Sequence, residues 1–198
     1  MILGFDTETT GLPLYRERND DPRQPHILQI AGILFDMEGR EVYRYSTLVK
    51  PGYGAEMHPD AYAAHGISLD RARLEGADPV EVATAFLEMV NRAVLIVGHN
   101  ISFDLRLLKI FLARHLRMTW EITCETFCTM WKAHPFTRTG KAGANGKNRS
   151  LNESYEHFFG PRPAAAHDAL NDIEATLRLF WHLTRELNVP MFKKGKAA

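Results

Sequence analysis

Residues 27–49, ILQIAGILFDMEGREVYRYSTLV, contain the pattern that decides the fold of this chain. Two runs rich in strand-forming residues, 27–35 and 42–49, are separated by residues 38–40 (EGR), which are typical of a hairpin turn. The apolar residues 2–6 (ILGFD) indicate a buried strand before them. Three strands in succession with short links predict an antiparallel meander at the start of the chain.

The second part of the chain has the periodicity of helices. We expect helices at 80–90 and 104–115, a short buried strand at 94–97, a fifth strand at 120–123, a helix reaching about Trp131, a helix from Leu151 and a long final helix around 170–184. Strands first and helix–strand–helix–strand–helix afterwards predict an α/β fold. This fold has a mixed five-stranded sheet that is antiparallel over the first three strands and flanked by helices.

Two segments are predicted to be loops. Residues 15–25 (YRERNDDPRQP) carry mixed charges and two prolines, which exclude a core element. Residues 134–150 (HPFTRTGKAGANGKNRS) contain three glycines and no acid, and indicate an exposed loop within the domain. Its basic side chains either guide a nucleic-acid backbone or are simply solvated: Arg138, Lys141, Lys147 and Arg149.

Length and composition limit the possible classes of protein. The 198 residues suit one domain, which we place at residues 1–188 and follow with a short basic tail at 189–198. Lys and Arg total 24, as do Asp and Glu, and this balance argues against a protein that coats nucleic acid. No apolar run is long enough to span a membrane, and no signal peptide is evident. With only two cysteines, Cys124 and Cys128, we expect core thiols and a cytoplasmic protein. These two cysteines are spaced one turn apart if the segment is helical.

Asp6 and Glu8 lie at the end of the first predicted strand. Residues two apart on a strand point to the same face, so the two carboxylates lie side by side. A divalent cation neutralises such a pair, and hard oxygen ligands suit Mg²⁺ or Mn²⁺. On the pair alone, a solvated strand end is the more common explanation.

Three further residues are candidates only in combination. Asp104 follows the strand at 94–97, near the strand-end edge where ligands bind in α/β sheets. Taken alone, its carboxylate is more simply explained by a favourable interaction with the dipole at the start of the next helix. His167 and Asp172 are five apart, so they converge only if His167 precedes the last helix and Asp172 lies in its first turn. Asp168 fits the N-cap between them. Alone, His167 is more simply an exposed loop histidine.

The joint pattern resembles a known family. FDTETTGL at residues 5–12, GHNISFD at 98–104 and HDALND at 167–172 resemble, in order, the three motifs of DEDDh (DnaQ-like) exonucleases. The resemblance extends from about residue 2 to 187 and is strongest to free-standing exonucleases of phages and prophages. Gln29 departs from the family pattern, in which many proofreading members carry Glu, and this puts substrate preference in question.

The resemblance implies a ribonuclease H-like fold and 3′→5′ exonuclease activity, with release of nucleoside 5′-monophosphates through two divalent metal ions, Mg²⁺ or Mn²⁺. By analogy, Asp6 bridges both metals, Glu8 and Asp172 hold the first, and Asp104 supports the second. His167 is then the general base that accepts a proton from the attacking water, so that activity rises with pH through its titration.

The same resemblance implies contacts to the 3′-terminal nucleotide. The residues concerned are Thr9, Gly11, Leu12, Ala64, His65, Asn100 and Phe103. Turn packing is the alternative for Leu12, and a helix-end role is the alternative for His65. Asn100 is expected to cap the helix that follows it, and Phe103 to pack beneath the site.

Several functions remain open at this point. The expected partner is the 3′ end of nucleic acid, with single-stranded DNA favoured and RNA as an alternative, and with replication or repair proteins as possible further partners. A nucleic-acid-binding module without activity is disfavoured because paired acids repel phosphate in the absence of metal. A ribonuclease H-type endonuclease is disfavoured by the FDTETTG turn. The sequence does not define an oligomeric state.

Overall fold

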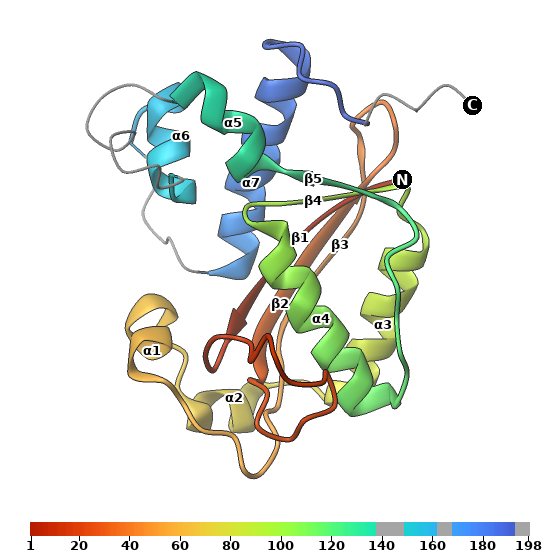
Figure 1. Cartoon of the computed structure of the whole chain (residues 1–198), viewed down its shortest axis with the longest axis vertical. Helices are drawn as coiled ribbons and strands as arrows, with labels where there is room; N and C mark the ends of the chain where they lie inside the picture. The colour runs from red at the N-terminus through yellow and green to blue at the C-terminus, as the bar shows by residue number, and fades with distance from the viewer. Residues whose placement is uncertain (138–148, 162–167, 193–198) are drawn as a thin grey trace.

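A mixed sheet forms the centre of the computed structural model, which describes residues 1–137, 149–161 and 168–192 (Figure 1). The strands are ordered β3-β2-β1-β4-β5. The first three, β1 (Ile2–Thr9), β2 (Ile27–Phe35) and β3 (Glu41–Leu48), pair antiparallel as a meander, whereas β4 (Leu95–Gly98) and β5 (Glu125–Cys128) extend the sheet in parallel. This is the predicted five-stranded α/β fold.

Helices cover both faces of the sheet. The helices α3 (Pro79–Asn91) and α4 (Ile101–Leu116) pack on one face, and α7 (Ala169–Arg185) packs on the other (Figure 1). Alternation along β1 produces this division: Leu3 and Phe5 join the core beneath α3 and α4, while Ile2 joins the core beneath α7. Odd-numbered β1 residues therefore face α3 and α4, and even-numbered ones face α7.

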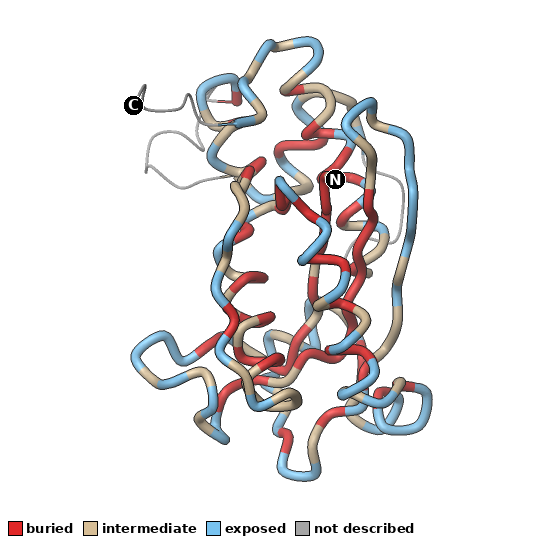
Figure 2. The backbone as a smooth tube through the Cα atoms, turned by 90° about the vertical axis from the view of Figure 1, so that its right-hand side faces the viewer, coloured by how far each residue is buried: buried red, intermediate tan, exposed pale blue. Residues whose placement is uncertain are grey.

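Shorter helices surround these layers. They are α1 (Pro59–His65), α2 (Leu69–Glu75), α5 (Thr129–Thr137) and α6 (Leu151–Phe159). Buried residues are concentrated in β1, β2 and β4 and on the inner helix faces, while β3 and the connecting segments are mainly exposed or partly exposed (Figure 2). Among the described residues, no helix combines the length and the apolar character that a membrane crossing requires.

Gly4 allows α7 to lie unusually close to β1. A Cβ atom at this position would lie 2.8 Å from Leu177 Cδ2 and 3.0 Å from Ile173 Cδ1, both on α7. A Cβ atom this close to its neighbours would force the Leu177 and Ile173 side chains to shift, so glycine suits the observed helix–strand distance. The close packing matters because both elements carry candidate site residues. On β1, Asp6 follows Gly4 by two residues, and on α7, Asp172 lies in the first turn.

Two predictions in the 120–128 region were wrong. The fifth strand is Glu125–Cys128 rather than residues 120–123, because its hydrogen-bond partner is β4, in the register Leu95↔Glu125. Trp120 is nevertheless buried in the main core, which explains its strand-like apolar signal. The cysteines are not one helical turn apart: Cys128 ends β5 and Cys124 precedes it. Both are free thiols that pack partly buried against the core, as expected.

Candidate active site

Three carboxylates meet at the C-terminal end of β1. Asp6, Glu8 and Asp172 each offer an oxygen within 4.8 Å of the others. Asp6 and Glu8 occupy even positions of β1 and so point towards α7, as the spacing predicted. Asp172 lies in the first turn of α7, which Gly4 allows to approach the strand. The structure thus brings together three of the five predicted catalytic residues.

The start of α7 is capped as the sequence predicted. The Asp168 carboxylate accepts hydrogen bonds from the backbone N–H groups of Leu170 and Asn171, at 3.1 and 3.2 Å. The Asp168 carbonyl accepts the N–H of Asp172 at 2.9 Å, so the cap leads directly into the helical hydrogen bonding. His167, the predicted general base, lies outside the described residues.

Asp104 approaches the site from the opposite side of β1. It lies in the first turn of α4, is almost fully buried, and accepts a hydrogen bond from the Thr7 hydroxyl at 2.8 Å. Thr7 is an odd-numbered β1 residue and therefore faces α4, which explains why Asp104 is not among the three clustered carboxylates. Sequence reasoning missed Thr7. Its position between Asp6 and Glu8, on the face towards the second motif, was the available signal.

The crowded carboxylates shift the proton affinity of the site. Burial raises the pKa of Glu8 to about 8, and the neighbouring charges of Asp172, Asp104 and Asp168 contribute in the same direction. Burial likewise raises the pKa of Asp104 to about 7, opposed by the Thr7 hydrogen bond. The site therefore binds protons when it lacks a cation, and this is the expected behaviour of a carboxylate cluster built for a metal ion.

A pocket of about 410 Å³ adjoins the carboxylates. It contains six of the residues that the resemblance assigned to the terminal nucleotide, namely Thr9, Gly11, Leu12, Ala64, His65 and Phe103. Leu12 is 77% exposed at its edge, so turn packing does not explain it. His58, Asp60 and Ala61 of the α1 region also line the pocket and were not identified from the sequence, because only the tertiary fold brings α1 beside the end of β1.

His65 connects the end of α1 to β1. Its Nδ1 accepts the backbone N–H of Ile67 at 3.0 Å, so Nε2 carries the proton and donates to the Thr9 carbonyl at 2.9 Å. His65 therefore has the helix-end role and also lines the pocket.

Asn100 does not cap α4 in the predicted way. It stands at the N-cap position, but its side chain makes no cap hydrogen bond, and its backbone is left-handed with φ 66°. The tight turn after β4 requires this backbone conformation, which asparagine tolerates better than most residues. Asn100 is not among the pocket-lining residues.

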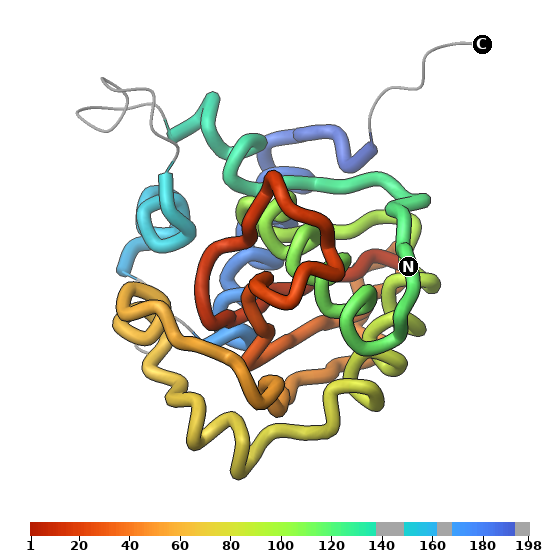
Figure 3. Tube along the Cα trace, turned by 60° about the horizontal axis from the view of Figure 1, so that its bottom comes forward, coloured from red at the N-terminus to blue at the C-terminus, as the bar shows by residue number. Residues whose placement is uncertain are grey.

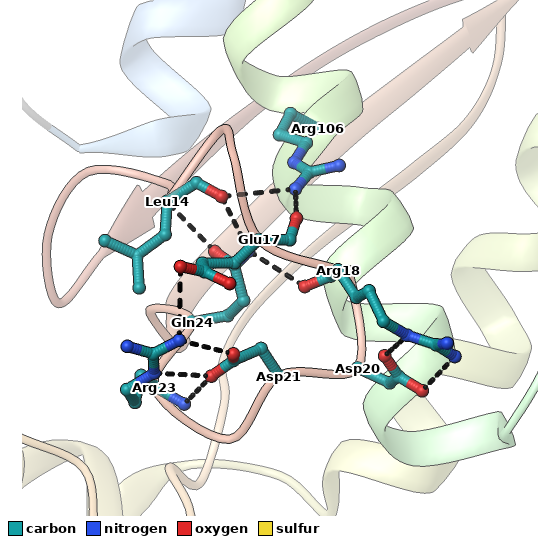
Figure 4. Close-up of polar contacts among 8 residues, drawn as sticks. All are labelled: Leu14, Glu17, Arg18, Asp20, Asp21, Arg23, Gln24 and Arg106. Atoms are coloured by element: carbon teal, nitrogen blue, oxygen red, sulfur yellow. Dashed lines mark hydrogen bonds and ion pairs between the residues drawn. The ribbon is translucent and has the colours of Figure 1, made fainter.

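The segment after Gly11 is a well-anchored loop beside α1 at one end of the molecule (Figure 3). The buried Gln24 amide bonds the backbone N–H and carbonyl of Leu14 and the carbonyl of Arg18, at 2.9, 3.0 and 3.0 Å (Figure 4). Arg106 of α4 donates to the carbonyls of Leu14 and Glu17. Residues 15–25 are a loop, as predicted, and hydrogen bonds from the Gln24 and Arg106 side chains anchor its backbone.

The basic loop at 134–150 is described only in part. The helix α5 extends to Thr137, so the first residues of this segment are helical rather than part of a loop. Arg149 Nε donates to the Thr137 carbonyl at 2.7 Å, which ties this cation to the end of α5. Arg138, Lys141 and Lys147 lie outside the described residues.

The sheet order, the carboxylate cluster and the adjoining pocket define a nuclease domain of the DnaQ-like superfamily. The family model named Exonuclease (RNase_T) matches residues 3–180, and the chain belongs to this family. The chain is 28% identical over 180 residues to a PolC-type DNA polymerase III of Thermotoga petrophila, covering 89% of this chain and 11% of the polymerase. A PolC-type polymerase of Thermotoga maritima matches with the same identity and coverage.

Solved structures of exonuclease I share the fold. The enzyme of Methylocaldum szegediense superposes with a TM-score of 0.70 and 25% identity, over 93% of this chain and 40% of that one. Escherichia coli exonuclease I in complex with a dT13 oligonucleotide gives a TM-score of 0.71 at 20% identity, over 94% of this chain and 42% of that one. The chain thus spans less than half the length of the relatives that it matches.

Proposed function

We propose that this protein is a metal-dependent 3′→5′ exonuclease of the DEDDh subtype, which releases nucleoside 5′-monophosphates from the 3′ ends of single-stranded DNA. The observation that carries this proposal is the convergence of Asp6, Glu8 and Asp172 within 4.8 Å beside a pocket of nucleotide size. The oligonucleotide complexes of Escherichia coli exonuclease I support DNA as the substrate class.

The residues of the site fit divalent metal ions. Their donors are carboxylate oxygens, the hard ligands that Mg²⁺ and Mn²⁺ prefer, and the raised pKa of Glu8 reflects the burial of its carboxyl group beside other acids. Asp6, Glu8 and Asp172 would hold the first ion, and Asp104 would support the second from the other side of β1. Two bound cations stabilise the attacking and the leaving oxygen of an in-line displacement.

The remaining steps fall to the protein's own groups. The pocket beside Glu8 would hold the terminal nucleotide, with Leu12 against its base and the Thr9–Gly11 turn near its 3′-OH. His167 would take the proton from the attacking water, a role that rests on the family resemblance. The cytoplasmic location, the similarity to phage exonucleases, the domain boundary at residue 188, and replication or repair partners stay predictions of the sequence.

The proposal is tested with a 5′-labelled oligonucleotide, prepared as DNA and as RNA and with a free or a blocked 3′ end, in Mg²⁺ or Mn²⁺. We expect a descending ladder from DNA that requires the free 3′ end. A ladder from RNA alone would establish the exoribonuclease instead, internal cuts an endonuclease, and binding without cleavage an inactive module.

The site assignment is tested by two matched variants. Asp6→Ala removes an acid of the carboxylate cluster and should abolish cleavage. Asp70→Ala removes an exposed acid in the first turn of α2 and should leave the rate unchanged. Cleavage by Asp6→Ala at the wild-type rate would refute the metal assignment.

A further inference from the structure

Gln29 of β2 contacts the first residues of α7 through both ends of its amide. Its Nε2 donates to Asp168 Oδ2 at 2.8 Å, and its Oε1 accepts the backbone N–H of Ala169 at 3.1 Å. The side chain is 8% exposed, so these bonds are shielded from water. Residues 139 and 140 positions apart in the chain are thereby joined at the edge of the carboxylate cluster.

The two bonds complete the cap of α7. The Asp168 side chain reaches the N–H groups of Leu170 and Asn171, but not that of Ala169, which is fully buried. A buried N–H without an acceptor is costly, and Gln29 supplies the missing acceptor. The neutral amide of Gln29 does this and also donates to the Asp168 carboxylate, whereas an ionised Glu has no proton to give.

The connection fixes one metal-site residue relative to the other two. Gln29 pairs directly with Glu8 across the β1–β2 ladder. Through Asp168 it also fixes the first turn of α7, in which the Asp168 carbonyl accepts the N–H of Asp172. One side chain thus links the ladder position opposite Glu8 to the helix turn that carries Asp172.

We infer that Gln29 is a positioning residue, which together with Asp168 aligns Asp172 with Asp6 and Glu8 for binding a divalent cation. This inference rests on the metal site of the proposed function. Partners that orient metal-binding groups typically change metal affinity about 10- to 100-fold when they are lost.

Exchange of the two partners provides the test. In the double variant Gln29→Glu/Asp168→Asn, the introduced carboxylate on β2 can accept from both the Ala169 N–H and the introduced amide at the N-cap. The oxygen of that amide can still cap the helix, and the net charge of the pair is unchanged. Each single change breaks one of the two bonds. Gln29→Glu places two carboxylates next to each other. Asp168→Asn either places two amide N–H₂ groups next to each other or, if the Gln29 amide rotates, turns its N–H₂ group towards the Ala169 N–H.

Mn²⁺ affinity, measured by titration calorimetry without substrate, is the readout. We expect Gln29→Glu and Asp168→Asn each to bind Mn²⁺ about tenfold or more weakly, and the double variant to recover close to the wild-type affinity. Gln29→Glu is decisive because added negative charge alone would strengthen cation binding. Asp78→Asn, the same change at the N-cap of α3, controls for helix capping and should leave Mn²⁺ affinity unaltered.

Three results would overturn the positioning role: single variants with wild-type affinity, tighter binding by Gln29→Glu, or a double variant no better than the singles. The thermal unfolding of each variant shows whether it is folded, and the double variant keeps the test valid if one single variant is not. Wild-type protein that binds Mn²⁺ but degrades no 3′ end would refute the proposed function and leave the positioning role to be judged by affinity. Wild-type protein that binds no Mn²⁺ would refute both.

Discussion

The Thr7 hydroxyl donates a 2.8 Å hydrogen bond to the Asp104 carboxylate, joining β1 to α4 inside the protein. Asp104 is almost fully buried, and this bond is the side-chain contact that stabilises its charged form. Between the two clustered acids of β1, Asp6 and Glu8, the strand thus also presents a residue that supports a fourth acid on the opposite face. The site is built on both sides of one strand.

Thr7→Val should shift the pH dependence of cleavage upwards. With the Thr7 hydrogen bond in place, burial holds the pKa of Asp104 at about 7; loss of the hydroxyl removes a contribution that lowers this pKa, so the carboxylate forms only at still higher pH. A hydrogen bond to a charged group contributes about 1.5–3 kcal/mol, so we expect about a tenfold lower kcat/KM near neutral pH and recovery in alkali. Thr7→Ser keeps the hydroxyl and should match wild type. An unshifted profile in Thr7→Val would contradict this role.

The metal-free protein should lose stability as the pH rises. Glu8 has a folded-state pKa of about 8 against an ordinary value of 4.5, so folding favours its protonated form. The contribution of Glu8 to the free energy of unfolding is fully present below its ordinary pKa of 4.5 and is lost as the pH rises through its folded-state pKa of about 8. The melting temperature in EDTA should therefore fall across this range, and Mn²⁺ should raise it most at the alkaline end. Glu8→Gln should flatten the curve in EDTA, and an equal slope in this variant would rule out Glu8 as the cause.

Gly4→Ala should destabilise the fold and weaken the site. The new methyl group would press on Leu177 and Ile173, and overpacking of this kind costs about 1–3 kcal/mol. Because the strain separates α7 from β1, Mn²⁺ affinity should fall as well. Gly54→Ala is the matched control, since its Cβ atom would meet nothing within 4 Å. Urea unfolding measures the difference, and equal midpoints for the two variants would disprove the close-packing argument.

Leu12→Ala should impair substrate binding without affecting stability. Leu12 is 77% exposed and lines the pocket, so its removal leaves no cavity in the folded protein. If its side chain covers the terminal base, KM should rise about fivefold, which corresponds to about 1 kcal/mol of lost apolar contact. Leu74→Ala, an 83% exposed leucine on α2, should change neither constant. A fall in melting temperature without a change in KM would show that Leu12 is structural.

The fold could be predicted where the signal is local. The meander at 27–49 has strand-forming residues around a turn, and all three antiparallel strands occur where expected. The fifth strand was misplaced because β5 is defined by parallel pairing with β4, and no local pattern separates it from the apolar residues around Trp120. The cap predicted for Asn100 failed for a similar reason, since the turn after β4 requires its backbone and not its side chain.

The sequence by itself determined the local placement of three clustered acids. Residue spacing placed Asp6 and Glu8 on one face of a strand, and the Asp168 cap placed Asp172 in the first turn of a helix. Only the tertiary structure decided how these elements meet. Gly4 sets how closely α7 approaches β1, Thr7 meets Asp104 across the strand, and Gln29 joins β2 to the start of α7. Such contacts join residues far apart in the chain, and strand and helix periodicity specify only which face a residue occupies, not which partner it finds there.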